Sequence, residues 1–270
     1  FIDYREGGIK GVKLRKEASK DIPITPIILG RDDSFYGDNP DLSKVKSQIR
    51  KLLKVADGIA PSGFGEITDE VANLIVEECR KEGKISSIHV AESESTQIES
   101  LDNFNKTEIE RGFDSKFSQL VHCTSPKNND LDLIKNSDAN VVVCPRANAT
   151  LNVGVVPLNE MLNLGIRPIL GTDNLMLNSP NMFRELEFTL KIMSVRHKSY
   201  LNPCELLKMA TTNGCQFIFG KSCIEIGQYA ELNIIKHFSK NYYLSLINRS
   251  ETKNILYTIN RYYTNSILNI

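Results

Sequence analysis

Short apolar runs rich in β-branched residues alternate along the chain with longer stretches of helical spacing. The clearest passage lies between Val141 and Asn174, where the pattern predicts a strand at 141–143, a helix at 156–164 and a strand at 168–170. Gly171-Thr172-Asp173 interrupts the last strand, which leaves a carboxylate at its C-terminal end. That end of a parallel α/β barrel carries the active site, so Asp173 is a candidate catalytic residue.

The same rhythm fills the preceding part of the chain. Apolar residues three and four positions apart, as at Val45, Ile49 and Leu52, make one face of a helix. Strands are predicted at 1–4, 26–29, 57–60, 85–91, 119–123, 141–143 and 168–170. Helices are predicted at 12–20, 42–55, 68–81, 96–111, 131–136, 156–164, 182–198 and 203–213. This order indicates an α/β fold of parallel βα units, either an open sheet or a barrel, and the absence of a GxGxxG motif after any strand disfavours a nucleotide-binding open sheet.

The pattern changes after residue 222. Glu231–Ile235 reads as a strand, and the tail from Leu244 to Ile270 has short apolar runs that indicate β structure. We therefore predict two domains, a barrel at 1–222 and the C-terminal part of a small β domain at 223–270. A tail of this length buries little surface alone, so it needs a partner segment or the barrel itself.

Charge and composition narrow the class of partner. The 270 residues hold 33 Lys and Arg against 33 Asp and Glu, with a pI near 7.1. Because no basic stretch interrupts this balance, the sequence predicts no binding to nucleic acid or to an anionic membrane surface. No apolar run reaches the roughly 20 residues that cross a bilayer. We expect a small-molecule substrate, and a homo-oligomer is one of the assemblies that the sequence allows.

The cysteines and the first residue of the chain bear on where in the cell the protein is found and on whether a further segment precedes Phe1. Six cysteines occur singly in apolar contexts, without CxxC pairs, which is typical of reduced core residues. With no signal peptide, they predict a cytoplasmic location. The chain begins at Phe1 rather than at Met, so we expect a further segment upstream.

Histidines are few, and two of the four stand at strand ends. His89 and His122 close the strands at 85–91 and 119–123, and Asp173 closes a third. A single histidine in such a place is more often structural, but this trio in order is typical of a hydrolytic metal site. Neutral imidazole and carboxylate suit Zn²⁺ or Fe²⁺, which lower the pKa of bound water to about 7. His197 and His237 lack such a context and are interpreted as structural.

Glu92 follows His89 by three residues, just beyond the strand. In a pocket that raises its pKa, a glutamate serves as a proton shuttle. A glutamate that is merely solvent-exposed in a loop would occur at the same position in the sequence. Both interpretations stay open on the residues alone.

Five segments together carry a resemblance to a known family. They are His89-Val90-Ala91-Glu92, Leu120-Val121-His122-Cys123, the stretch 144–151 (CPRANATL), Leu170-Gly171-Thr172-Asp173-Asn174, and the stretch 224–232 (IEIGQYAEL). In this order they resemble the amidohydrolase superfamily, in the branch of cytosine-deaminase-like and chlorohydrolase-like enzymes. The resemblance implies a distorted TIM-type (β/α)8 barrel, of which this chain supplies strands two to eight, and one divalent metal, zinc more than iron.

The resemblance also implies roles for the site residues. His89 and Asp173 match metal ligands, and Asp173 takes a proton from the attacking water. His122 matches the histidine that hydrogen-bonds the attacking oxygen, and Glu92 the acid that protonates a ring nitrogen of the substrate. The loop residues Arg146 and Asn148 match substrate-binding positions.

One departure from the family pattern is that no His-x-His pair occurs anywhere in the chain. The family's first strand carries this pair, which supplies two metal ligands, so we expect both histidines upstream of Phe1.

The implied reaction is hydrolytic deamination of a purine, a pyrimidine or a related heterocycle. Hydrolysis of a ring chloride or a cyclic amide by the same mechanism is the first alternative. The second is a non-catalytic barrel fragment, against which the three retained polar groups count, because burying them unpaired costs about 1 to 3 kcal/mol each.

Overall fold

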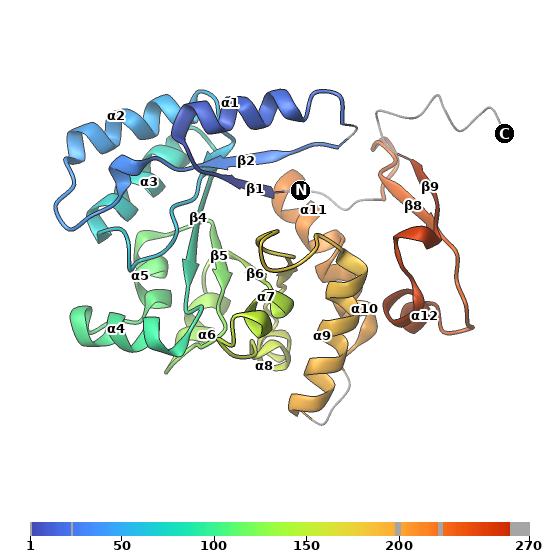
Figure 1. Ribbon diagram of the computed structural model, residues 1–270. Helices are drawn as coiled ribbons and strands as arrows, with labels where there is room; N and C mark the ends of the chain where they lie inside the picture. The colour runs from blue at the N-terminus through green and yellow to red at the C-terminus, as the bar shows by residue number, and fades with distance from the viewer. Residues whose placement is uncertain (1, 23, 198–200, 221–223, 260–270) are drawn as a thin grey trace. The chain divides into compact units, whose positions relative to one another are not determined.

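The structure is a computed structural model that describes residues 2–22, 24–197, 201–220 and 224–259 (Figure 1). The chain folds into two compact units, Phe1–Val141 and Val142–Ile270. Each unit is described in turn. Strands occur at all seven positions that the apolar pattern predicts.

Five parallel strands in chain order form the sheet of the first unit. They are β1 (Ile2–Arg5), β2 (Ile27–Gly30), β3 (Gly58–Ile59), β4 (Ile85–Val90) and β5 (Gln119–His122). Each strand after β1 follows a helical crossover, so all five C-terminal ends lie at the same edge of the sheet. His89 and His122 lie at that edge, as the pattern predicts.

The helices of this unit begin and end at residues with a clear local cause. They are α1 (Gly8–Ala18), η1 (Asp33–Phe35), α2 (Leu42–Leu53), α3 (Asp69–Lys81), α4 (Glu94–Phe104), α5 (Glu108–Ser115) and α6 (Asp130–Lys135). Thr68 caps α3, because its side chain accepts a hydrogen bond from the Val71 N–H. Helix α2 buries Val45, Ile49 and Leu52 on one face. Helices α1, α2 and α3 cover one face of the strands β1 to β4 (Figure 1).

The single helix predicted at 96–111 is wrong, because the segment forms two helices. Asn105 takes a left-handed conformation with φ +54° and ends α4. Thr107 then starts α5 with a capping box, in which its hydroxyl accepts from the Glu110 N–H and the Glu110 carboxylate accepts from the Thr107 N–H. The chain therefore turns between the helices, and this turn brings Glu108 beneath the end of β4.

The second unit combines a short parallel strand pair with helices and a hairpin. Its elements are β6 (Asn140–Val143, which begins at the end of the first unit), α7 (Pro145–Thr150), α8 (Leu158–Asn163), β7 (Ile169–Leu170), α9 (Met182–His197), α10 (Pro203–Met209), α11 (Thr212–Phe219), β8 (Leu232–Ile235), α12 (Tyr242–Arg249), η2 (Thr252–Asn254) and β9 (Ile255–Ile259). β6 pairs with β7 in parallel, and β8 pairs with β9 antiparallel. Helix α9 packs against α7, α8, α10 and α12.

Three predictions for this unit need correction. The predicted loop that carries Arg146 and Asn148 is a helix, α7, which Pro145 starts because a proline fits the first turn of a helix, where its missing N–H costs nothing. The helix predicted at 203–213 is two helices, α10 and α11. The tail is not purely β, because Asn241 caps α12 through the Leu244 N–H. The predicted domain boundary after residue 222 falls outside the described residues and stays a prediction.

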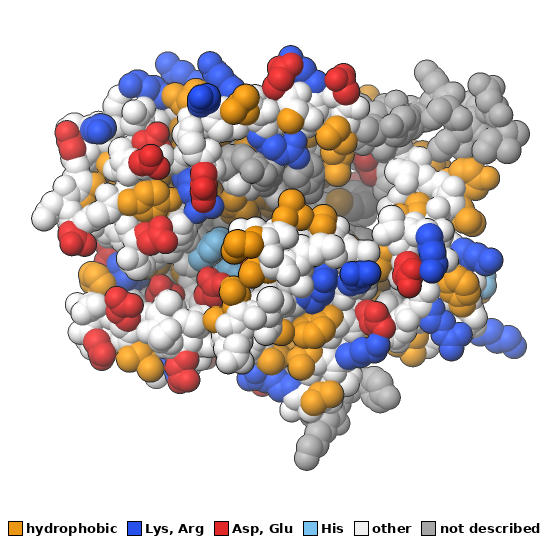
Figure 2. Space-filling view, viewed as in Figure 1, with side chains coloured by type: hydrophobic (Ala, Val, Ile, Leu, Met, Phe, Trp, Pro, Cys, Tyr) orange, Lys and Arg blue, Asp and Glu red, His pale blue; other side chains and the backbone are white. Residues whose placement is uncertain are grey.

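The surface charge and the length of the helices bear on the kind of partner that the protein can bind. On the face shown in Figure 2, Lys and Arg side chains are interspersed with Asp and Glu. Within the described ranges, every helix is too short or too polar to cross a bilayer.

Four of the described cysteines are thiols, namely Cys79, Cys123, Cys144 and Cys204. Cys215 on α11 is disulfide-bonded, so the prediction of reduced cysteines is wrong for Cys215. Spacing along a chain does not show which sulfurs approach each other in space.

Candidate active site

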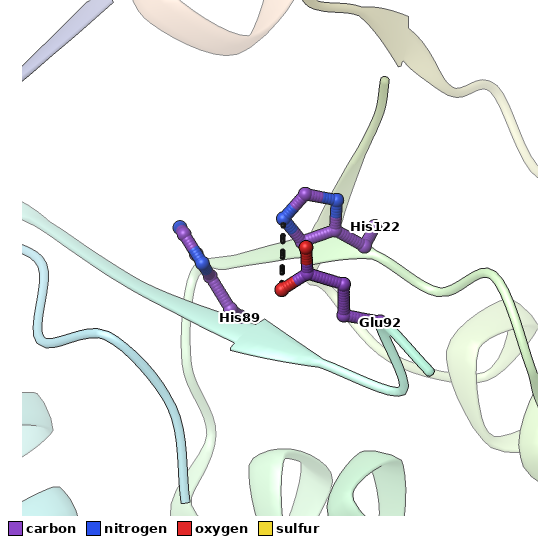
Figure 3. A group of neighbouring side chains, drawn as sticks. All are labelled: His89, Glu92 and His122. Atoms are coloured by element: carbon purple, nitrogen blue, oxygen red, sulfur yellow. Dashed lines mark ion pairs between the residues drawn. The ribbon is translucent and has the colours of Figure 1, made fainter. Parts of the chain in front are cut away.

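Two histidines meet where β4 and β5 end (Figure 3). The strands pair so that Val90 lies opposite His122, which puts His89 and His122 one register step apart at the C-terminal edge. Their ring centroids are 4.9 Å apart, and the ring planes meet at 84°. The sequence prediction that strand-end histidines converge is confirmed for this pair.

The backbone at both strand ends is strained. Ala91, His122 and Cys123 have φ values of +50°, +75° and +48°, a left-handed conformation that costs a residue with a Cβ roughly 1 to 2 kcal/mol. The Cys123 N–H donates to the Val90 carbonyl, and the Thr124 N–H donates to the Ala91 carbonyl. These bonds lock the two turns together. Strain held in place this way is typical of functional sites.

Glu92 turns its carboxylate toward His122 (Figure 3). Its Oε2 lies 3.6 Å from Nε2 of His122, and its side chain is 31% exposed, whereas that of His122 is 1% exposed. A solvated loop acid would point away from the sheet edge. The Glu92 carboxylate therefore lies beside His122 at the sheet edge, and its role as a proton shuttle stays a prediction.

The surroundings of His89 keep its ring neutral. Desolvation is the main cause that lowers its pKa to about 3, and the nearby His122 and Arg31 add to the effect. The Tyr4 ring meets the His89 ring edge-on at 5.9 Å, and the Tyr4 hydroxyl donates to Oε1 of Gln119 at 3.0 Å. A fixed, neutral imidazole is the form that binds a metal ion.

The donor set at this edge fits a divalent cation. One ligand atom from each of His89, Glu92 and His122 lies within 4.8 Å of the other two. Two imidazole nitrogens and a carboxylate oxygen are the ligand types that zinc and iron(II) take in catalytic sites. Of these three residues the resemblance names only His89 as a ligand, and its neutral imidazole suits the metal that the resemblance implies.

Asp173 lies in the second unit, three residues beyond the end of β7. It takes a left-handed conformation with φ +58°, which a short polar side chain tolerates. Gly171 makes the approach to it possible, since a Cβ there would lie 3.0 Å from Cγ1 of Val142 and 3.1 Å from Sγ of Cys144. A larger residue at position 171 would therefore push the side chains of Val142 and Cys144 by a few tenths of an ångström.

Arg146 and Asn148 lie on α7 rather than on a loop. Arg146 Nη1 donates to the Ser179 carbonyl, and its Nη2 donates to Oδ1 of Asn178, both at 3.3 Å. Asn148 is fully buried. Arg146 thereby fastens the segment that follows Asp173 to α7. The substrate-binding role predicted for both residues stays a prediction.

Glu185, at the start of α9, is a residue of this region that sequence reasoning missed. It is fully buried, its Oε1 accepts the Arg146 N–H at 2.9 Å, and its Oε2 lies 3.6 Å from Nη1 of Arg146. Burial is the main cause that raises its pKa to about 7, and the Asp173 charge adds to it, while Arg146 opposes it. Arg184 and Glu187 stand close to Glu185 in the sequence, so the sequence alone suggests an exposed, charged helix surface rather than a buried carboxylate.

Glu185→Gln is expected to change how stability depends on pH. An unfolded glutamate ionises near pH 4.5, but the folded Glu185 holds its proton up to about pH 7. Between these values the folded state binds more protons, so this group lowers the free energy of unfolding as the pH rises, by on the order of 2 kcal/mol. Urea unfolding at pH 4.5 and pH 7.5 should show this loss in the parent protein and not in Glu185→Gln. Glu187→Gln, a partly exposed neighbour on the same helix, is the control, and an identical pH dependence in all three proteins would refute the prediction.

His237 makes contacts with residues near it in the sequence. Nδ1 of His237 lies 3.3 Å from the Ser239 carbonyl, and its ring meets that of Tyr242 edge-on at 5.2 Å. These are local contacts just after β8, in agreement with a structural role. The His197 side chain is outside the described part of the chain.

Comparison with known proteins agrees with this geometry. The Amidohydrolase family model matches residues 1–260. A protein of Methanothermobacter thermautotrophicus, named as an aminohydrolase without a stated substrate, is 49% identical over 259 residues, which are 96% of this chain and 67% of the relative. A 5-methylthioadenosine/S-adenosylhomocysteine deaminase of Caldanaerobacter subterraneus is 30% identical over 158 residues, 55% of this chain and 36% of the relative.

A solved structure shows the same fold. The adenosine deaminase of Xanthomonas campestris with bound zinc superposes with a TM-score of 0.78 at 15% identity, over 92% of this chain and 62% of that one. The chain thus spans about two thirds of the length of the first relative and less of this structure. The family model covers nearly every residue, and so the chain belongs to the amidohydrolase family of hydrolytic enzymes.

Proposed function

We propose that the protein is a metal-dependent aminohydrolase that releases ammonia from an amino-substituted heterocycle, with aminopurines as the first candidates. The carrying observation is the Glu92 carboxylate beside His122 and His89 at one sheet edge. Departure of ammonia requires a proton on nitrogen, and the proposal assigns the transfer of this proton to Glu92. The deaminase names of the Caldanaerobacter relative and the Xanthomonas structure support the choice of substrate.

The proposed metal is one divalent cation, zinc before iron. His89 and Asp173 would hold it, with two further histidines from a segment that precedes Phe1. When bound, a zinc ion lowers the pKa of a water ligand to about 7, which makes a nucleophile available at neutral pH. The low pKa of His89 supports its role as a metal ligand, because at pH 7 no proton competes with the metal for the ring nitrogen.

The proposed proton movements involve three side chains. Asp173 accepts a proton from the attacking water, and His122 donates a hydrogen bond to that oxygen. Glu92 gives its carboxyl proton to a ring nitrogen, which makes the amino-bearing carbon electrophilic. After the C–O bond forms, the proton taken up by Asp173 passes to the amino nitrogen. The C–N bond then breaks and ammonia leaves. The hydroxyl left on the ring carbon returns its proton to Glu92, and the ring keeps the oxygen as a carbonyl.

A substrate screen tests the proposal. The full-length protein, loaded with zinc, is incubated with adenosine, 5-methylthioadenosine, guanine and cytosine, and ammonia is measured by a coupled assay. We expect release from at least one aminopurine, and removal of the metal by a chelator should abolish it. Absence of ammonia from every substrate, with about one zinc per chain bound, would contradict the proposal.

A further inference from the structure

We infer that Glu108 is a positioning residue for Glu92, at the centre of a buried hydrogen-bond network beneath the ends of β4 and β5. The inference deepens the proposed function and rests on it where activity is concerned. Glu108 lies on the first turn of α5, is 5% exposed, and touches neither His89 nor His122 in any described hydrogen bond. Its connection to the site runs through the backbone of Ala91.

One oxygen of Glu108 makes both of its side-chain hydrogen bonds. Oε2 accepts the Ala91 N–H at 2.7 Å and the Thr96 hydroxyl at 3.0 Å. Ala91 directly precedes Glu92, and Thr96 lies in the first turn of α4, which follows Glu92. The carboxylate of Glu108 thus fixes the chain on both sides of the residue that carries the proton.

Ala91 needs this support, because its conformation is unfavourable. It is fully buried with φ +50°, and nothing in its own side chain stabilises a left-handed backbone. Its carbonyl accepts the N–H groups of Thr124 and Ser125, which follow His122 in sequence. Glu108 therefore holds a junction to which the segments of both Glu92 and His122 are tied.

The network continues through a second buried carboxylate. The Glu108 N–H donates to Oε1 of Gln97 at 2.8 Å, and Nε2 of Gln97 donates to the Ser125 carbonyl at 3.1 Å and to Oδ2 of Asp130 at 3.0 Å. The Lys127 N–H also donates to Asp130, at 2.7 Å. The turns after β4 and β5 are therefore anchored to the same set of side chains.

Fold stability alone does not explain a carboxylate in this place. Burial raises the pKa of both Glu108 and Asp130, which means that the ionised forms are costly where they lie. A neutral acceptor would satisfy the Ala91 N–H at lower cost. The Glu92 charge also raises the pKa of Glu108, so the two carboxylates lie close enough to interact. The two hydrogen bonds that Glu108 accepts, rather than its charge, therefore carry its role beside the shuttle.

The test compares Glu108→Ala, Glu108→Asp and Glu108→Gln in the zinc-loaded, full-length protein. Alanine removes the acceptor, and aspartate keeps the charge but is one methylene too short to reach the Ala91 N–H. We expect both variants to lose about 10- to 100-fold in kcat with KM within twofold, because a small displacement of a catalytic group costs that much. Glutamine should restore kcat, since its carbonyl oxygen can take the place of Oε2 and accept both bonds.

A second measurement does not depend on activity. Hydrogen exchange at the Ala91 amide should become faster in Glu108→Ala and Glu108→Asp, and stay slow in Glu108→Gln. Asp114→Ala, an exposed change at the other end of α5, is the control and should alter neither kcat nor this amide. If no substrate is deaminated by the parent protein, the proposed function fails, and amide exchange still tests the positioning. Unchanged exchange and kcat in the alanine and aspartate variants, or a loss that glutamine does not restore, would overturn the inference.

Discussion

Glu92→Gln should lower kcat for ammonia release by about 10²- to 10⁴-fold, the range that general acid–base groups contribute. The amide keeps the shape of the carboxylate beside His122 but cannot deliver a proton to the ring. Because the side chain is 31% exposed and lies 3.6 Å from Nε2 of His122, beyond hydrogen-bond distance, the fold should tolerate the change. Steady-state kinetics on the best substrate of the screen, with metal content measured in parallel, gives the result.

The Glu92 variant also separates the proposed reaction from its first alternative. A ring chloride leaves without a proton, so hydrolysis of a chlorinated substrate analogue should suffer much less than ammonia release in Glu92→Gln. The matched control is Glu94→Gln, which changes an acid that is two residues away and paired with Lys127 at the surface. Retained ammonia release in Glu92→Gln would remove Glu92 from the mechanism. Loss of bound metal would reassign Glu92 as a ligand.

Asp173→Asn is expected to abolish turnover, with a loss in kcat of at least about 10³-fold, since one change removes a metal ligand and a proton acceptor. Metal affinity should fall as well, because an amide oxygen carries no charge. The left-handed conformation at position 173 suits asparagine as well as aspartate, so the fold should be kept. Kinetics, competition with a chromogenic chelator and thermal unfolding measure the three properties.

Asp138→Asn, at an exposed position, is the control for the aspartate substitution. It should leave kcat, metal affinity and the unfolding temperature unchanged. Turnover by Asp173→Asn at a tenth of the parent rate or more would show that this carboxylate is not essential. The catalytic role assigned to the end of β7 would then be wrong.

Much of the fold was predictable because apolar periodicity reports local geometry. Runs such as Val141–Val143 and the helical face at Val45, Ile49 and Leu52 have the spacing that their burial requires. Strand ends follow from the same pattern. The sequence alone therefore indicated that His89 and His122 stand at neighbouring strand ends, and the register of β4 and β5 confirms it.

Local signals failed where two conformations fit the same residues. The pattern at 96–111 is compatible with one helix, and the left-handed Asn105 with the capping box at Thr107 makes two. Pro145 reads as a strand terminator and is also a good first residue of a helix. In both places packing against the rest of the unit selects one of the two conformations that the local sequence allows.

The sequence by itself determined which residues carry the candidate chemistry, namely His89, Glu92, His122 and Asp173, because strand ends and motif spacing are local properties. Only the tertiary structure decided which groups hold them in place. Glu108 reaches Ala91 across 17 positions, and Glu185 reaches Arg146 across 39. Such partners leave no periodic trace, since a hydrogen bond between distant residues constrains only two positions in the chain. Positioning groups are therefore found from the fold, and reacting groups from the pattern.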